Sequence, residues 1–112
     1  MIESSRSEKI LEGPTLTLRE YSRLRAIEKG VDPDKYEKLI ECESKYKINE
    51  YGDNGYAYGI LQFHRKTFDS FARQYELDID YYNPYSQIDL STSMIRDKYL
   101  SHWSCAYIIG WL

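Results

Sequence analysis

Hydrophobic residues recur along this chain mainly at the helical spacing of three and four positions, and local start and stop signals divide them into separate helices. Residues 17–20 have the form of a capping box and Gly30 is a typical helix stop, so a first helix is predicted between them. The Asp32-Pro33 pair, an N-cap followed by proline, predicts a second helix that runs to about Ser44.

Two further helices and a closing segment are predicted in the second half of the chain. One helix runs from about Arg65 to Tyr75, and its predicted buried positions are Phe68, Phe71, Ala72 and Tyr75. We interpret Asn83-Pro84 as a break, after which residues 86–89 open a helix that runs to about Tyr99. Its predicted inward positions are Ile88, Thr92, Ile95 and Tyr99. Residues 103–111 form a short apolar closing segment.

Residues 45–63 do not follow the helical pattern. They contain the turn signal Gly52-Asp53-Asn54-Gly55, which includes an Asn-Gly pair, followed by an aromatic and apolar stretch. This pattern predicts a small hairpin or extended loop. The predicted fold class is therefore mainly α (α+β), a helical domain with this hairpin or loop at one side.

Length and composition predict one soluble globular domain. The chain has 112 residues, of which 42% are hydrophobic and 29% charged. Residues 1–15 are polar and aperiodic and predict a flexible N-terminal arm, so the folded domain is expected to span residues 16–112. We expect no membrane-spanning segment and no export signal within this chain, because no apolar run has the required length.

Charge argues against nucleic acid as a partner. The net charge is −3, and the basic residues are spread among acidic ones instead of forming a stripe. Tyrosine is abundant, with 12 residues. A tyrosine ring has a flat apolar face and a hydroxyl group, which suits sugar rings, although tyrosines also build the cores of small domains.

Glu43 occupies a position that an apolar residue would be expected to fill. The second helix carries Tyr36, Leu39 and Ile40 on its apolar face, and Glu43 continues that face at i+7, whereas Glu41 points to solvent. An apolar setting raises the pKa of a carboxyl group, and the C-terminal end of a helix acts in the same direction. A carboxyl group that stays protonated near neutral pH can serve as a glycosidase acid. The alternative is a partly exposed glutamate at a frayed helix end.

Two short motifs carry a resemblance to a known family. Residues 42–44 read Cys-Glu-Ser, and residues 58–63 read Tyr-Gly-Ile-Leu-Gln-Phe. This pair resembles the lysozyme-like superfamily, in particular the soluble lytic transglycosylases (SLT domains) and the resuscitation-promoting-factor-like domains. The resemblance is specific over residues 38–64 and looser over residues 65–105.

The resemblance implies cleavage of the β-1,4 bond between N-acetylmuramic acid and N-acetylglucosamine in peptidoglycan glycan strands. It implies that Glu43 is the catalytic acid/base and that Ser44 orients the carboxyl group or the substrate. The implied substrate-binding residues are Ser44, Tyr58, Ile60, Leu61, Gln62 and Tyr107. No cofactor is implied.

The sequence departs from the family pattern at two places. Residues 45–46 read Lys-Tyr where the family has glycine or an aromatic residue, and residues 106–108 read Ala-Tyr-Ile where it has Ala-Tyr-Asn. These departures leave open whether the chain is a hydrolase or a transglycosylase. Hydrolysis normally needs a second carboxylate, for which Glu50 and Asp53 are the candidates, although both also suit a simple turn. The transglycosylase route needs one carboxylate and forms a 1,6-anhydro product.

The two cysteines, Cys42 and Cys105, leave two possibilities from the residues alone. They are either buried free thiols in a cytosolic protein or a disulfide. The resemblance implies the disulfide, and with it a secreted, periplasmic or cell-wall-associated protein.

Other functional classes receive less support. The histidines, His64 and His102, do not stand at metal-ligand spacing, so no metal site is expected, and His64 is expected to be an ordinary surface or helix-start residue. One rival is a lysozyme-like module that binds peptidoglycan without cutting it. Another is a cytosolic helical interaction module with reduced cysteines. We expect the protein to be a monomer.

Overall fold

The computed structural model describes residues 16–112 and is mainly helical, as predicted. The predicted N-terminal arm, residues 1–15, lies outside the described residues. The helices are α2 (Leu18–Glu28), α3 (Pro33–Ser44), α4 (Arg65–Gln74), α5 (Pro84–Arg96) and α6 (Ser104–Ile108). In the part of the chain that the structure describes, no helix is both long and apolar enough to cross a membrane.

The first two helices begin where their caps were predicted. The Thr17 side chain accepts a hydrogen bond from the backbone N–H of Glu20, and the Glu20 side chain accepts one from the N–H of Thr17, which completes the capping box of α2. The Asp32 side chain accepts hydrogen bonds from two backbone N–H groups of α3, and Pro33 is the first helical residue. Both helix starts are confirmed.

The start and end predicted for α5 are wrong. The Asn83 side chain accepts a hydrogen bond from the backbone N–H of Tyr85, so Asn83 is the N-cap and Pro84 begins the helix. The helix ends at Arg96, and Tyr99 lies beyond it with 39% of its surface exposed. The predicted inward position of Tyr99 is therefore wrong, because the chain leaves the helix before the periodic pattern reaches it.

A small antiparallel sheet occupies the predicted hairpin region. Its strands are β1 (Tyr51–Gly52), β2 (Ala57–Tyr58) and β3 (Phe63–His64), in the order β1-β2-β3. Because neighbouring side chains on a strand point to opposite faces, the register divides the residues into two sets. Gly52, Ala57 and His64 share one face, and Tyr51, Tyr58 and Phe63 share the other.

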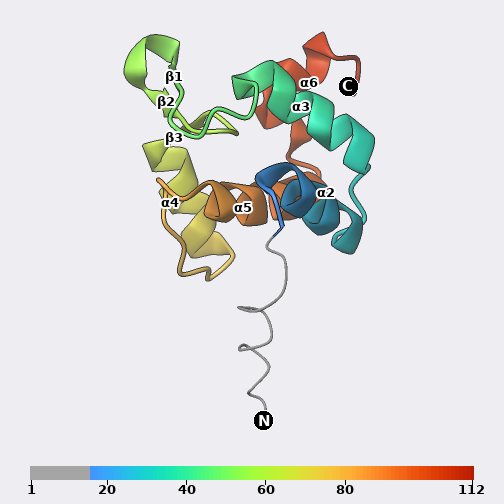
Figure 1. Ribbon diagram of the computed structural model, residues 1–112. Coiled ribbons are helices and arrows are strands. Elements are labelled where there is room, and N and C mark those ends of the chain that lie inside the picture. Colours follow the sequence, from blue (N-terminus) through green and yellow to red (C-terminus); the bar gives the residue numbers. More distant parts are fainter. Residues whose placement is uncertain (1–15) are drawn as a thin grey trace.

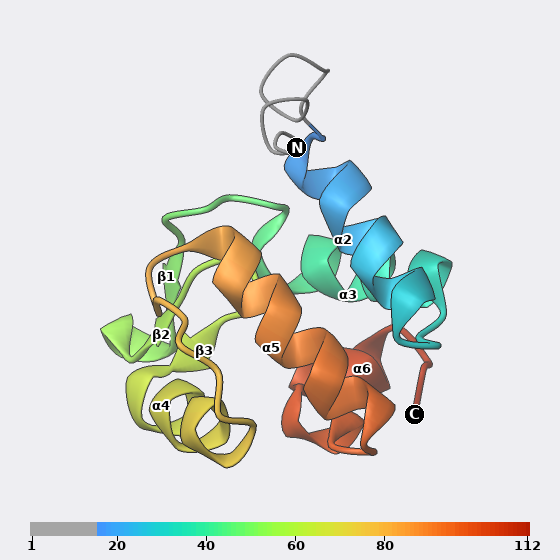
Figure 2. The ribbon, with the colours of Figure 1, turned by 90° about the horizontal axis from the view of Figure 1, so that it is seen from below.

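The elements form two sides with α5 between them. The sheet and α4 lie on one side, and α2, α3 and α6 lie on the other (Figures 1 and 2). The core is continuous between the two sides, and its largest fully buried side chains include Tyr36, Leu39, Ile40, Ile60, Leu61, Phe63, Phe68, Ile88, Leu90 and Met94. Trp103 also joins the sides, since its indole N–H donates to the carbonyl of Leu61 at 2.9 Å.

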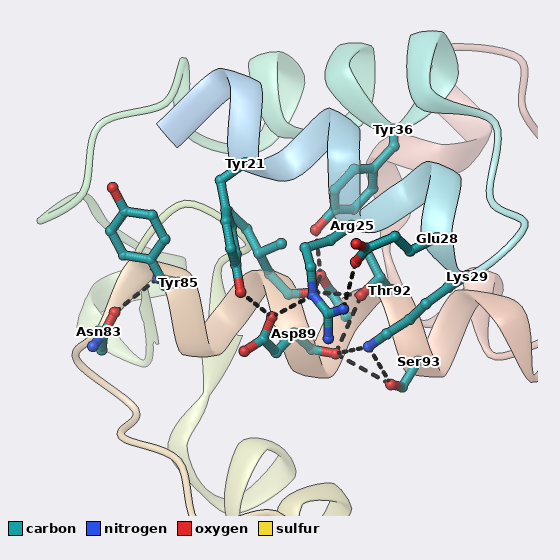
Figure 3. Close-up of polar contacts among 12 residues, drawn as sticks. Tyr21, Arg25, Glu28, Lys29, Tyr36, Asn83, Tyr85, Asp89, Thr92 and Ser93 are labelled. Carbon is teal, nitrogen blue, oxygen red and sulfur yellow. Dashed lines mark hydrogen bonds and ion pairs between the residues drawn. The ribbon is translucent and has the colours of Figure 1, made fainter. Parts of the chain in front are cut away.

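Polar contacts hold α2 against α5 (Figure 3). Tyr21 and Arg25 of α2 both donate to the carboxylate of Asp89, at 2.7 and 2.9 Å. The Lys29 ammonium donates to the Asp89 carbonyl and to the Ser93 hydroxyl, at 2.8 and 2.7 Å. Burial lowers the pKa of Lys29 to about 8. We call these five residues the α2–α5 network.

Candidate active site

Glu43 lies in the last turn of α3 with its carboxyl group half-buried. The helix ends at Ser44, because Lys45 adopts the left-handed conformation with φ of 55°. Burial raises the pKa of Glu43 to about 7, and a hydrogen bond from the backbone of Cys105 opposes part of that rise. A large fraction of the carboxyl groups is therefore protonated at neutral pH.

The carboxyl group of Glu43 lines a cavity of about 510 Å³ between the two sides of the molecule. One wall comes from the end of α3 and the segment that leads into α6. The opposite wall comes from the sheet, its first turn and the start of α4. The lining residues are Glu43, His102, Trp103 and Ser104 on the first wall and Asp53, Ala57, Gln62, His64 and Thr67 on the second.

A disulfide holds the first wall together. Cys42 and Cys105 are bonded, as the family resemblance implied, and their Cα atoms are 6.0 Å apart. Cys42 directly precedes Glu43, and Cys105 supplies the backbone hydrogen bond to its carboxyl group. The bond therefore fixes the end of α3 against α6 at the place where Glu43 faces the cavity.

Ser44 and the segment between β2 and β3 are hydrogen-bonded to other groups of the protein. The buried Ser44 hydroxyl donates to the carbonyl of Ile60 at 2.9 Å. The N–H of Leu61 donates to the side-chain oxygen of Gln87 at 3.0 Å. Ile60 and Leu61 are fully buried. The first contact attaches the helix that carries Glu43 to the segment that leads into the opposite wall, and the second attaches that segment to α5.

The two candidate second carboxylates are separated by the structure. Asp53 lines the cavity with Glu43, whereas Glu50 is not among the lining residues. The carbonyl of Glu50 instead accepts a hydrogen bond from the side-chain amide of Gln62 at 3.0 Å, and that amide also donates to the carbonyl of Gly59. Gln62 is thus held firmly in the cavity wall.

Tyr58 and Tyr107 lie outside this cavity. Tyr58 is on the other face of the sheet, where its ring packs at 4.8 to 5.7 Å from the rings of Tyr51, Tyr81 and Tyr82. Tyr107 lies on α6 with 59% of its surface exposed. Neither residue lines the cavity with Glu43.

The structure adds two histidines that the sequence reasoning did not include in the site. His64 Nε2 lies 2.7 Å from Asp53 Oδ2, and the ring of Tyr56 stacks on the His64 ring. Burial, and secondarily the charge of His64, lower the pKa of His102. Strand alternation places His64 on the same face as Ala57, which is the one sequence signal for its position. No local signal exists for His102, because α6 and its preceding segment meet α3 only through the fold.

A second hollow of about 560 Å³ lies near the end of α5 and is slightly larger. Its lining includes Asp32, Lys98 and Trp111. The Asp32 carboxylate is occupied by capping α3, so this hollow lacks the free acid found in the Glu43 cavity. Within residues 16–112, no three histidine, cysteine, aspartate or glutamate side chains are grouped to hold a metal ion.

Comparison with known proteins gives one finding. A family model described as the transglycosylase SLT domain matches residues 20–107, a range that includes both walls of the cavity. Neither a curated protein nor a solved structure gives a significant match to the chain.

Proposed function

The chain belongs to the transglycosylase SLT domain family, and from that membership we propose that it cleaves the β-1,4 bond between N-acetylmuramic acid and N-acetylglucosamine in peptidoglycan. The membership supports peptidoglycan cleavage of the lytic transglycosylase type. One observation supports Glu43 as the catalytic residue in this proposal. Its carboxyl group is half-buried and lines a cavity, and burial raises its pKa to about 7.

Glu43 acts in this proposal as the general acid. Its proton passes to the bridging oxygen while the bond between that oxygen and the anomeric carbon breaks. A general acid works best when its pKa is close to the working pH, since it is then protonated and still gives up its proton readily. Such a group contributes about 10²- to 10⁴-fold to the rate.

The second half of the reaction needs an attacking group. In the transglycosylase route the sugar's own 6-hydroxyl attacks, with or without prior help from the N-acetyl group, and the product is a 1,6-anhydro sugar. In hydrolysis water attacks. Either hydroxyl must lose a proton, to Glu43 after it has become a carboxylate or to another group. Asp53 is the second carboxylate that lines the cavity.

The other residues have supporting roles in this proposal. Gln62 lies in the wall with its amide fixed by two backbone carbonyls, so it gives the sugar a rigid surface. Ser44 is a positioning residue, because its hydroxyl ties the helix of Glu43 to Ile60. Tyr58 and Tyr107 are not among the residues that line the cavity, so in this proposal they contact only a longer glycan strand.

We also propose that the protein works outside the cytoplasm. The Cys42–Cys105 disulfide is consistent with an oxidising compartment, and peptidoglycan is found there.

The release of soluble fragments from purified peptidoglycan tests this function. We expect Glu43→Gln to lower the rate at least about 100-fold, because the amide cannot donate a proton in this way. Glu41→Gln is the matched control, since Glu41 lies on the same helix but is exposed and paired with Arg19, and its rate should stay within twofold of wild type. Binding of the wall by both wild type and Glu43→Gln without any release would support the non-catalytic module instead.

A further inference from the structure

The cavity contains a second pair of acid–base groups opposite Glu43. His64 Nε2 lies 2.7 Å from Asp53 Oδ2, and both side chains line the cavity. They come from the sheet side of the molecule, whereas Glu43 comes from α3. A carboxylate beside an imidazole holds the ring in one orientation and favours one of its two tautomers.

The contribution of this pair to the stability of the fold is too small to explain its presence. The His64 and Asp53 side chains are 49% and 60% exposed, and an exposed ion pair contributes about 0–1 kcal/mol. Asp53 and Asn54 have φ of 51° and 58° in the turn that presents the carboxylate. This left-handed conformation costs an ordinary residue about 1–2 kcal/mol, and aspartate and asparagine somewhat less because they tolerate it. The pair therefore offsets at most part of the cost of the turn.

The pair leaves one ring nitrogen of His64 for the substrate. The nearby carboxylate favours a proton on Nε2, so a neutral ring keeps its acceptor lone pair on Nδ1. No hydrogen bond from residues 16–112 to Nδ1 is present, and the ring is held by Asp53 on one side and by stacking with Tyr56 on another. His64, whose Nδ1 has no partner within residues 16–112, thus lines the same cavity as Glu43.

We propose that His64 is the base of the second half of the reaction and that Asp53 is its positioning residue. The inference rests on the proposed function and assigns the base step that it leaves open. The oxygen of the attacking hydroxyl forms its bond to the anomeric carbon, and its proton moves to Nδ1 of His64. The bond from the anomeric carbon to the leaving oxygen breaks, and that oxygen takes the proton of Glu43. The imidazolium then returns its proton to the Glu43 carboxylate through solvent, so both groups are regenerated.

Four variants test this assignment on soluble peptidoglycan fragments, with the turnover rate and the product masses as readouts. We expect His64→Ala to lower kcat about 100-fold and Asp53→Asn about tenfold, while the double variant is no slower than His64→Ala, because Asp53 acts through His64. Asp69→Asn is the matched control. It removes a carboxylate from another exposed pair on the same side, that of Arg65 and Asp69, and should stay within twofold of wild type.

Added imidazole provides a readout that a structural role would not move. It should restore the rate of His64→Ala at least about tenfold and leave Asp53→Asn unchanged, because only the first variant lacks a base. The product masses identify the attacking hydroxyl as that of water or of the sugar.

An unchanged rate in His64→Ala, beside an inactive Glu43→Gln, would overturn this inference and leave the proposed function standing. Loss of activity in His64→Ala without rescue, together with additive loss in the double variant, would also overturn it. An inactive wild type would instead contradict the proposed function.

Discussion

The α2–α5 network and the Glu43 cavity both contain a titratable group with a shifted pKa, but the groups have different surroundings. Burial lowers the pKa of Lys29 to about 8 in the network and raises that of Glu43 to about 7 in the cavity. The Lys29 ammonium donates to two oxygen atoms of α5 (Figure 3). Glu43 has a single backbone partner, Cys105, and faces open space.

This difference separates a structural use of burial from a chemical one. In the network, Tyr21, Arg25 and Lys29 of α2 donate hydrogen bonds to Asp89 and Ser93 of α5. The polar atoms of these five residues therefore hold the two helices together. The Glu43 carboxyl group has most of its hydrogen-bonding capacity free and a cavity in front of it. A shifted pKa alone therefore does not identify a site, whereas a shifted pKa beside a cavity and without a charged partner does.

Matched carboxyl-to-amide substitutions in the two regions should have opposite effects on stability. Asp89→Asn removes the charge that Tyr21 and Arg25 contact, in a region where the side chains of Arg25 and Asp89 are about a quarter exposed. We expect it to lower the free energy of unfolding by about 2 kcal/mol, less than the cost of breaking a fully buried pair. Urea denaturation measures this loss, and turnover should be nearly unchanged. A large loss of turnover in the folded variant would show that the network takes part in the reaction.

Glu43→Gln should instead stabilise the fold, by a smaller amount and only above acidic pH. The pKa of Glu43 is raised in the folded state, so its contribution to stability is full below about pH 4.5 and is lost as the pH rises through about 7. The charged carboxylate therefore destabilises the folded state at pH 8. Replacing it with the amide should raise the free energy of unfolding by about 1 kcal/mol, after allowance for partial exposure. Urea denaturation should show this gain at pH 8 and almost none at pH 4. Equal effects at both values would contradict the raised pKa.

Much of the fold could be predicted from local signals. The capping box at residues 17–20 and the Asp32-Pro33 pair correctly located two helix starts. Asn83-Pro84 carries the same signal as Asp32-Pro33, a capping residue followed by proline, but was interpreted as a break. The pair is ambiguous in sequence, since proline suits the first turn of a helix as well as it suits a loop.

The site could be predicted only where a local pattern existed. Glu43 was found because its helix face is otherwise apolar. The opposite wall is predictable in part, through Gln62 and Asp53. His64 is exposed and is the N-cap of α4, as expected for a surface or helix-start residue, but the fold also brings it to the cavity. His102 and Trp103 could not be found, because they reach the cavity only when α6 packs against α3 some 60 positions earlier in the chain. Leu61 is an implied substrate-binding residue, yet its backbone N–H and carbonyl are hydrogen-bonded to Gln87 and Trp103.

Mass spectrometry of the products that the wild type and Glu43→Gln release from purified peptidoglycan tests the central claim most directly. The wild type should release muropeptides cut between N-acetylmuramic acid and N-acetylglucosamine, and the variant should release none. Ends of 1,6-anhydro-muramic acid would identify a lytic transglycosylase, and reducing ends would identify a hydrolase. The same products at the same rate from both proteins would contradict the role of Glu43, and no products from either would contradict the proposed activity.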